Sequence, residues 1–389
     1  MVAERAVGAT LTNVNPIVAE VTARGRVSFA DFMELALYDP RNGYYTRTRR
    51  GSGPVGRAGD YLTAPTASPI FAAVMARLLD DLVGETGRPV TLLELGAGEG
   101  LFLESLRQAL GRKAKKVVER VVAIEVGEWA RKRLARRWRG AEVASCLAEV
   151  PRPRGSVMLF ASELYDALPA NRVTVRREGH ELVLREFFVE PAGRGKLRWT
   201  AAEPTSPAIA AYLQDCGVVL EEGQIAEVRP RLRALHAANL AWCGHDGLAV
   251  LVEYGHPTRR LYDSKMRRHG SLVGYRRHRV VDDVLSQPGS IDITAHVSFD
   301  DLSGGAADIG WERGEIRPLG AFLALHGGPE LLPSARNGAL SSAQWAELAS
   351  AKRLLVPSGM GIDLKVLVQG RGEIWEAYRR AATPPPLEA

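Results

Sequence analysis

The stretch VTLLELGAGEG, at residues 90–100, is the most informative part of this 389-residue chain. An apolar run ends at Glu94, glycines follow at alternate positions, and LFLESLRQAL then begins a helical pattern. A strand that enters a glycine turn and continues as a helix lets a ligand approach bare backbone beside a helix N-terminus. The stretch therefore predicts a ligand site at the end of a strand in an α/β fold.

The acidic residue before the glycines separates this pattern from the dinucleotide-binding fingerprint G-x-G-x-x-G. The pattern E-x-G-x-G-x-G suits a ligand with an amine, a carboxylate and a ribose, and it resembles motif I of class I S-adenosylmethionine (SAM) methyltransferases. We expect Gly96 and Gly98 to lie against this cofactor, and Glu94 to hold the turn or to reach the methionine amine through water. The turn alone leaves a purely structural role open, because any tight strand-to-helix connection can use such glycines.

Strands and helices alternate after this motif. Apolar runs at residues 90–95, 121–126, 157–163 and 248–255 predict strands, and helical patterns separate them. Such runs are typical of a parallel sheet that is covered on both faces. The predicted fold class is therefore α/β: a Rossmann-like class I methyltransferase core with a mostly parallel sheet and added helical segments that cover the substrate.

The same patterns divide the chain into five parts. We expect a leader with one short helix, a core with an inserted hairpin and helix around residues 171–246, an accessory strand with a helical cap, a closing strand, and a flexible tail. These parts cover residues 1–26, 27–255, 256–362, 363–372 and 373–389, respectively. Within the accessory part, SIDITAHVSF (290–299) is expected to form one strand. The Gly- and Arg-rich residues 47–59 are expected to form a mobile loop.

The composition is that of an ordinary globular protein, with 46% hydrophobic and 25% charged residues. Cys146, Cys216 and Cys243 are widely spaced and form no CxxC pair, which argues against a disulfide framework and against a zinc site. We therefore expect no metal and a reducing, cytoplasmic location. The N-terminus shows neither a secretory signal nor a convincing transit peptide.

The formal net charge is +6, and arginines concentrate at residues 107–139 and 259–279. Aromatic residues are not interleaved with these arginines as a stacking surface for bases would need, so we expect no nucleic-acid partner. No apolar stretch approaches the ~20 residues that span a bilayer, so we expect no membrane insertion. The oligomeric state is left open.

Ligands of open α/β sheets gather at the carboxyl ends of the strands, and acidic residues occupy such positions here. Glu125 ends the second predicted strand, and its carboxylate can accept hydrogen bonds from two ribose hydroxyls, although it could also cap the next helix. Glu163 and Asp166 lie in ASELYDALPANRV after the third strand. They could bind the fork of an acceptor guanidinium or, equally, cap the helix that follows.

In SIDITAHVSF, apolar and polar residues alternate with period two, as expected for a strand. The polar face carries Asp292, Thr294 and His296. His296 could be a general base or a substrate contact, with Asp292 as its orienting partner. A half-exposed strand would show the same alternation, so this reading competes with a structural one.

Eight stretches carry a resemblance to a known family: FADFMELALYDPRNGYY, GDYLTAPTASPIF, LLELGAGEG, SELYDALPANRV, VEYG, YRRHR, PGSIDITAHVSF and SGMGIDLKVLVQG. In them the chain resembles the MidA/NDUFAF7 family (DUF185) of SAM-dependent methyltransferases, whose mitochondrial members resemble protein-arginine methylases. The resemblance implies SAM as the cofactor and a protein-arginine N-methyltransferase activity. It also places Asp60 and Thr63 near the cofactor, and Glu163 and Asp166 at the acceptor.

The chain departs from the family pattern at Ser162, Thr66, Glu253 and Ser290, which affects the acceptor assignment more than the cofactor site. The implied partner is a protein acceptor, such as a client in the assembly of a respiratory complex. Two other functions stay open. One is a small-molecule O- or N-methyltransferase, and the other is a non-catalytic SAM-binding assembly factor.

Overall fold

A computed structural model describes residues 15–49, 51, 53–56, 58–334 and 340–382. Residues 1–14 of the predicted leader and residues 383–389 of the predicted tail lie outside the described residues, as do parts of the 47–59 loop. Within the described part, no helix is long and apolar enough to cross a bilayer. No group of three or more His, Cys, Asp and Glu side chains in that part could hold a metal ion.

An eight-stranded sheet forms the centre of the molecule, in the order β15-β16-β10-β5-β2-β3-β4, with β14 paired to β10. In that order the strands are β15 (Glu315–Pro318), β16 (Leu364–Arg371), β10 (Gly247–His256), β5 (Val157–Ser162), β2 (Val90–Leu95), β3 (Val118–Ile124), β4 (Glu142–Ala144) and β14 (Val297–Ser298). Only β15 and β16 join the sheet by antiparallel pairing. The predicted α/β class with a mostly parallel sheet is confirmed.

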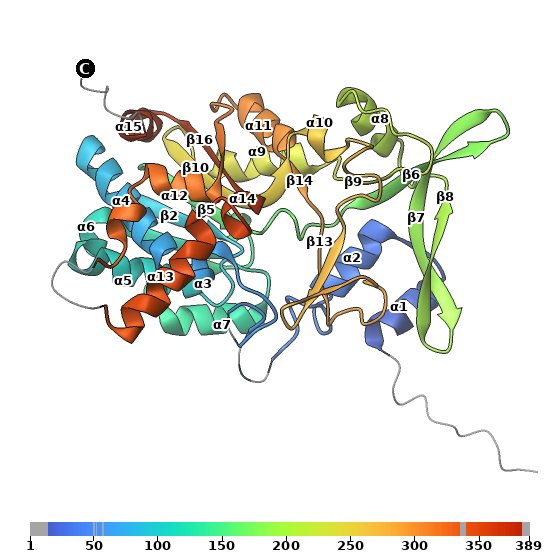
Figure 1. Ribbon diagram of the computed structural model, residues 1–389, viewed down its shortest axis with the longest axis horizontal. Coiled ribbons are helices and arrows are strands. Elements are labelled where there is room, and N and C mark those ends of the chain that lie inside the picture. Colours follow the sequence, from blue (N-terminus) through green and yellow to red (C-terminus); the bar gives the residue numbers. More distant parts are fainter. Residues whose placement is uncertain (1–14, 50, 52, 57, 335–339, 383–389) are drawn as a thin grey trace, which may run out of the picture.

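Helices cover both faces of this sheet, because its buried side chains alternate between two apolar clusters. In β2, Leu92 belongs to one cluster and Leu93 to the other. The first face is covered by α4 (Pro69–Thr86), α5 (Leu101–Leu110), α12 (Leu319–Leu325), α13 (Ser342–Leu355) and α15 (Glu373–Ala381). The second face is covered by α9 (Leu232–Trp242) and α11 (Phe299–Asp308). This layered core occupies the left of Figure 1.

An antiparallel sheet lies beside the core, on the right of Figure 1. Its strands are β1 (Val27–Ser28), β6 (Asn171–Glu178), β7 (Glu181–Gly193), β8 (Lys196–Ala202) and β9 (Ile225–Val228). The predicted hairpin is confirmed as β6 and β7, which join through Gly179 with a φ of 63°. Apolar side chains of α1 (Pro16–Arg24), α2 (Phe29–Tyr38) and α8 (Pro207–Asp215) pack on this sheet in two small cores.

The prediction of one strand at residues 290–299 is wrong. Asp292–Thr294 forms β13, in a three-stranded sheet with β11 (Val273–Arg276) and β12 (Arg279–Val281), whereas β14 pairs with β10 of the central sheet. The chain leaves the strand between them, because the Ala295 N–H donates a hydrogen bond to the main-chain carbonyl of Asp166 (3.0 Å). The period-two pattern thus spans two strands of different sheets.

The prediction of a flexible tail is also wrong for its described beginning. Residues 373–381 form α15, and Ile374, Trp375 and Tyr378 bury their side chains in the first core cluster, against α4 and β16. Burial of these large side chains holds the helix on the core. The remaining α-helices in the described part are α3 (Ala64–Ala67), α6 (Ala114–Val117), α7 (Glu128–Arg137), α10 (Thr258–Leu261) and α14 (Met360–Asp363).

Candidate active site

The glycine turn connects β2 to α5. Gly96 and Gly98 have φ values of 69° and 52°, in the left-handed region that favours glycine. The Gly96 N–H donates to the Ile124 carbonyl (2.8 Å), which ties the turn to the end of β3. A Cβ atom at Gly96 would lie 3.0 Å from Leu164 Cδ1, so the Leu164 side chain would have to shift to admit a side chain at this position.

Glu125 follows β3 and is fixed by the glycine turn and by the start of α7. One carboxylate oxygen accepts a hydrogen bond from the Gly98 N–H (2.9 Å), and the other accepts one from the Gly127 N–H (2.7 Å). Each oxygen keeps a second lone pair for a ligand. Burial raises the pKa of Glu125, and the N–H groups oppose this shift by stabilising the carboxylate.

A cavity of about 330 Å³ opens where β2, β3, β4 and β5 end, which is the position at which open α/β sheets bind ligands. Apolar side chains such as Ile124, Trp129 and Leu147 suit a flat ring, and the neighbouring carboxylate suits a sugar diol. The lining therefore fits a nucleoside. Four of the predicted cofactor residues line this cavity: Thr63, Gly96, Gly98 and Glu125.

The other two predicted cofactor residues, Glu94 and Asp60, are not among the lining residues. Glu94 is buried in β2, and one of its carboxylate oxygens has no hydrogen-bond partner among the described residues. Burial, and then the charge of Glu125, raises the pKa of Glu94 well above its usual range. Asp60 instead accepts hydrogen bonds from the Tyr44 hydroxyl (2.9 Å) and from the N–H of Arg277 (3.0 Å) between β11 and β12.

A second cavity, of about 100 Å³, adjoins the first. Tyr45, Tyr61 and Glu163 line both cavities and so form their common wall. The structure thus brings the three predicted catalytic residues, Glu163, Asp166 and His296, into one cavity beside the predicted cofactor cavity. The other lining residues are Leu62, Tyr254, Val273, Tyr275, Asp292 and Thr294.

Three carboxyl groups face this second cavity. Glu163 accepts a hydrogen bond from the Ala64 N–H (3.0 Å), and Asp292 accepts one from the Tyr45 hydroxyl (2.6 Å). One oxygen of Asp166 has no hydrogen-bond partner within the described ranges. Loss of solvent raises the pKa of all three carboxyl groups, that of Asp292 to about 7. A bound cation would lower these pKa values again, so the cavity is suited to a positively charged group.

A fourth carboxyl group, at the end of β10, holds the loop that carries Glu163 and Asp166. Glu253 is fully buried and accepts hydrogen bonds from the N–H groups of Leu164 (2.8 Å), Tyr165 (2.9 Å) and Asp166 (3.3 Å). Glu163 itself has a φ of 52°, which costs a non-glycine residue about 1–3 kcal/mol. The hydrogen bonds to Glu253 therefore stabilise a loop whose backbone conformation is unfavourable at Glu163.

His296 has a different environment from the one that the sequence suggested. Asp292 bonds to Tyr45 and does not orient it. The His296 ring lies against the rings of Tyr254 and His256, with centroids 6.0 and 5.5 Å away. Burial, reinforced by nearby cations, lowers the pKa of His296 to about 3, so the ring is neutral at neutral pH. Its Nδ1 atom has no hydrogen-bond partner in the part that the structure describes.

The aromatic lining of the second cavity is not among the features predicted from the sequence. Tyr45, Tyr61, Tyr254 and Tyr275 all face it, and they come from four separate segments. A signal was present, because YDPRNGYY, GDYLTAP, VEYG and YRRHR each supply one of these tyrosines. Aromatic faces attract cations, which agrees with the charge of the carboxyl groups.

The fold is that of an α/β protein with a ligand cavity at the carboxyl ends of its strands, and the lining of this cavity fits a nucleoside. Comparison with known families specifies this class further. Residues 71–316 match the family of S-adenosyl-L-methionine-dependent methyltransferases, and the chain belongs to this family. It is a SAM-dependent methyltransferase.

Similar proteins agree with this assignment. The chain is 24% identical over 318 residues to the protein arginine methyltransferase NDUFAF7 of Danio rerio, covering 75% of this chain and 71% of that protein. It is 25% identical over 321 residues to the human NDUFAF7, covering 72% and 65%. A COG1565 superfamily member from Burkholderia thailandensis, solved with bound S-adenosyl-homocysteine, is 26% identical, with a TM-score of 0.76 and coverage of 91% and 92%. The family resemblance and SAM as the cofactor are confirmed.

The expected cytoplasmic location is corrected by these comparisons. Both NDUFAF7 proteins are named as mitochondrial. The expectation rested on scattered, unpaired cysteines, which report the redox state of a compartment. Because the cytoplasm is not the only reducing compartment, this signal could not select it.

Proposed function

We propose that this protein transfers the methyl group of SAM to an arginine side chain of a protein acceptor. The observation that carries the proposal is the second cavity, in which three carboxyl groups and four tyrosines face the same small space beside the cofactor cavity. Carboxylates bind the planar fork of a guanidinium, and aromatic faces favour its charge. The names of the curated relatives point to the same acceptor.

In the first cavity, we assign Thr63, Gly96, Gly98 and Glu125 as cofactor contacts. The bare backbone at Gly96 leaves space for the cofactor, and Glu125 accepts hydrogen bonds from ribose hydroxyls. Glu94 lies buried in β2, directly before the turn. When bound, SAM supplies an electrophilic methyl group on a sulfonium.

In the second cavity, we assign Glu163 and Asp166 to the guanidinium. Glu163 lies on the common wall, so it is placed to hold the nitrogen that faces the cofactor cavity. A guanidinium nitrogen that gains a methyl group must lose a proton, and a carboxylate with a raised pKa is suited to accept it. The neutral His296 ring contributes Nδ1 as a hydrogen-bonding contact for the acceptor.

The test uses the purified full chain, SAM with a labelled methyl group, and a library of short peptides with one central arginine and randomised flanks. A matched library has lysine at the centre. We expect label in the arginine library alone and methylarginine after acid hydrolysis. Unlabelled peptides together with labelled small metabolites in a cell extract would instead identify a small-molecule methyltransferase. Tight SAM binding without transfer to any acceptor would identify a non-catalytic assembly factor.

A further inference from the structure

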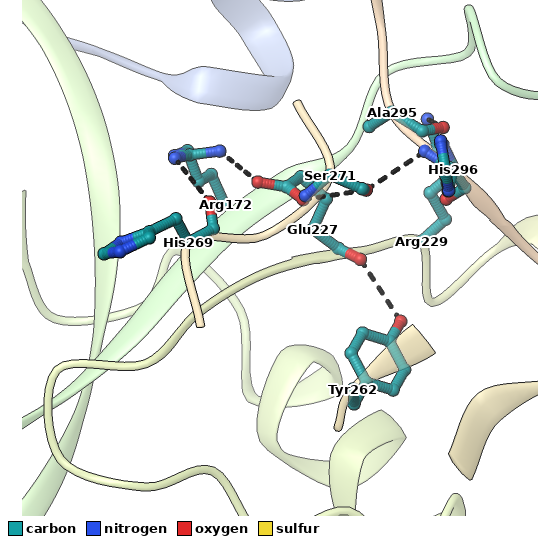
Figure 2. A network of polar contacts seen from close by, with 8 residues as sticks. All are labelled: Arg172, Glu227, Arg229, Tyr262, His269, Ser271, Ala295 and His296. Atoms are coloured by element: carbon teal, nitrogen blue, oxygen red, sulfur yellow. Dashed lines mark hydrogen bonds and ion pairs between the residues drawn. The ribbon is translucent and has the colours of Figure 1, made fainter. Parts of the chain in front are cut away.

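Arg229, directly after β9 of the antiparallel sheet, is buried and donates four hydrogen bonds to main-chain carbonyls. Its Nη2 donates to the carbonyls of Asp166 (2.7 Å) and Ala295 (2.9 Å). Its Nε donates to Leu168 (2.9 Å), and its Nη1 donates to His296 (3.0 Å). Figure 2 shows Arg229 beside Ala295 and His296. No salt bridge joins this guanidinium to a carboxylate within the described ranges.

These four carbonyls belong to the two segments that carry the acceptor-site residues. Residues 163–169 follow β5 and carry Glu163 and Asp166, whereas residues 295–296 join β13 to β14. The planar guanidinium has N–H groups in fixed directions, so one side chain can hold both segments at once. A lysine ammonium has only three donors on one nitrogen and cannot reproduce this geometry.

A second series of hydrogen bonds connects β9 to His296. The buried carboxylate of Glu227 accepts hydrogen bonds from the Ser271 N–H (2.6 Å) and the Ser271 hydroxyl (3.1 Å), and it pairs with Arg172. The Ser271 hydroxyl oxygen in turn accepts a hydrogen bond from the His296 N–H (3.1 Å), as Figure 2 shows. A Cβ atom at Gly270 would lie 2.5 Å from a Glu227 oxygen, so glycine at this position leaves the space that this carboxylate occupies.

We propose that Arg229, supported by Glu227, is a positioning residue that sets the geometry of the acceptor site. Arg229 lines neither cavity, so it acts through the main chain of Asp166 and His296. The inserted antiparallel sheet thereby becomes part of the acceptor machinery. This inference rests on the proposed arginine methylation.

The test compares Arg229→Lys with a matched control, Arg371→Lys, in the full chain. Arg371 also donates to a main-chain carbonyl, that of Ile309 (3.2 Å), but it pairs with Gly247 at the opposite end of β10 from the cavities. Calorimetry with S-adenosyl-homocysteine probes the cofactor cavity, and ethylguanidinium added to that complex probes the acceptor cavity. A misplacement of 1 Å can cost about 10²-fold in rate. We therefore expect kcat/KM on the arginine peptides to fall by about 10²-fold in Arg229→Lys.

Ethylguanidinium affinity should fall by about tenfold in Arg229→Lys, because the two carboxyl-bearing segments are no longer fixed. The affinity for S-adenosyl-homocysteine should change much less. Arg371→Lys should behave like the wild-type chain in all three measurements.

A pH profile separates positioning from a loss of stability. The Arg229 charge lowers the pKa of the Asp166 carboxyl, against the larger upward effect of burial. Arg229→Gln removes that charge and so raises this pKa further. The increase of ethylguanidinium binding with pH should therefore move to higher pH in Arg229→Gln than in Arg229→Lys. A purely structural role would lower the binding-competent fraction equally at every pH.

If neither Arg229 variant folds, Ser271→Ala tests the same support through the second series of hydrogen bonds. It should weaken ethylguanidinium binding and leave S-adenosyl-homocysteine binding close to that of the wild type. Unchanged ethylguanidinium affinity and pH profile in the folded variants would overturn the positioning role. A wild-type chain that binds S-adenosyl-homocysteine but neither ethylguanidinium nor arginine peptides would overturn the proposed function itself, and this role with it.

Discussion

The first cavity, which we propose holds the cofactor (the cofactor cavity), and the second, which we propose holds the acceptor (the acceptor cavity), have a common wall but are built in different ways. The cofactor cavity takes its main polar contacts from one strand–turn–helix–strand unit, where Gly96 and Gly98 expose backbone and Glu125 is held by that backbone. The acceptor cavity combines distant segments, as the hydrogen bond between Tyr45 and Asp292 shows, since these residues are 247 positions apart. Ligand binding in the cofactor cavity is therefore expected to depend on the backbone conformation of the turn, and ligand binding in the acceptor cavity on charged side chains. Steric changes should therefore break one site, and changes of charge should break the other.

The largest effect is expected from Gly96→Arg. A Cβ atom there meets Leu164 at 3.0 Å, and the φ of 69° disfavours any side chain. An arginine would also enter the space assigned to the cofactor. We expect SAM affinity to fall by at least about 100-fold, which corresponds to roughly 3 kcal/mol. Calorimetry measures this loss, and circular dichroism confirms that the variant is folded. Undiminished SAM affinity would contradict the site.

Gly98→Ala is the matched control for this steric argument. Its φ of 52° is equally unfavourable, but a Cβ atom there would meet nothing within 4 Å. The expected cost of the backbone conformation is about 1–2 kcal/mol of folding stability. Because a methyl group is much smaller than an arginine side chain, SAM affinity should fall by less than in Gly96→Arg. If Gly98→Ala lowered SAM affinity as much as Gly96→Arg does, then the backbone conformation of the turn, and not the volume of the added side chain, would determine SAM binding.

The next largest effect is expected from Glu163→Gln, which keeps the shape of the common wall and removes its charge. The variant cannot pair with a guanidinium or accept its proton, so kcat/KM should fall by about 10²–10³-fold. SAM affinity should stay close to that of the wild type. Glu178→Gln, at an exposed ion pair with Arg185 in the hairpin, is the control and should leave both quantities unchanged. Full activity of Glu163→Gln would remove this residue from the mechanism.

The difference between the cavities also explains which of their residues can be predicted from the sequence. The glycine turn and Glu125 are encoded by local spacing, so the cofactor side was predictable from one stretch. Asp166 and His296 were recognised only as separate candidates, because their common support, Arg229, lies 63 positions from Asp166. Asp292 is predicted from the sequence as the orienting partner of His296, whereas in the structure only 3% of its surface is exposed and the hydroxyl of Tyr45 donates to it.

The start of the predicted tail differs from the acceptor cavity, because its structure is encoded locally. The spacing of Ile374, Trp375 and Tyr378 is amphipathic, and it predicts the helix that the flexible-tail interpretation ignored. The second cavity therefore depends on contacts between distant segments, whereas the helix at residues 373–381 is encoded by local periodicity.

Asp292→Asn should show a smaller effect that depends on pH. The folded protein raises the pKa of this carboxyl from 3.8 to about 7, chiefly through burial. The folded state then binds the proton more tightly than the unfolded state, so the carboxyl lowers stability as the pH rises through this range. Asparagine carries no such cost. The variant should have a higher Tm than the wild type at about pH 8, and this gain should disappear at about pH 4.

Thermal unfolding at both pH values measures this difference, and activity on arginine peptides should fall at the same time. A gain in Tm that is independent of pH would show that the carboxyl is not held in its neutral form by burial. A loss of SAM affinity in the same variant would mean that the acceptor cavity is not separate from the cofactor cavity.

The smallest effect is expected from Asp60→Asn, which lies between the two regions. The Asp60 carboxylate holds the Tyr44 hydroxyl and the Arg277 N–H, and its carbonyl accepts the His278 N–H (2.6 Å). Arg277 and His278 have φ values of 50° and 59°, so this turn needs outside support. The turn joins β11 to β12, and β11 brings Tyr275 to the acceptor cavity.

Asparagine keeps only one acceptor oxygen, so one of the two side-chain hydrogen bonds is lost, at a cost of about 1 kcal/mol. The KM for arginine peptides should rise about fivefold, with SAM affinity close to that of the wild type. Asp282→Asn, an exposed change in the same region, is the control. The family resemblance placed Asp60 near the cofactor, and a larger loss of SAM affinity than of peptide affinity would favour that placement. In that case residue 60 would couple the two cavities. A change of one side-chain charge would then affect the cofactor cavity as well, and the two cavities could not be treated as independent.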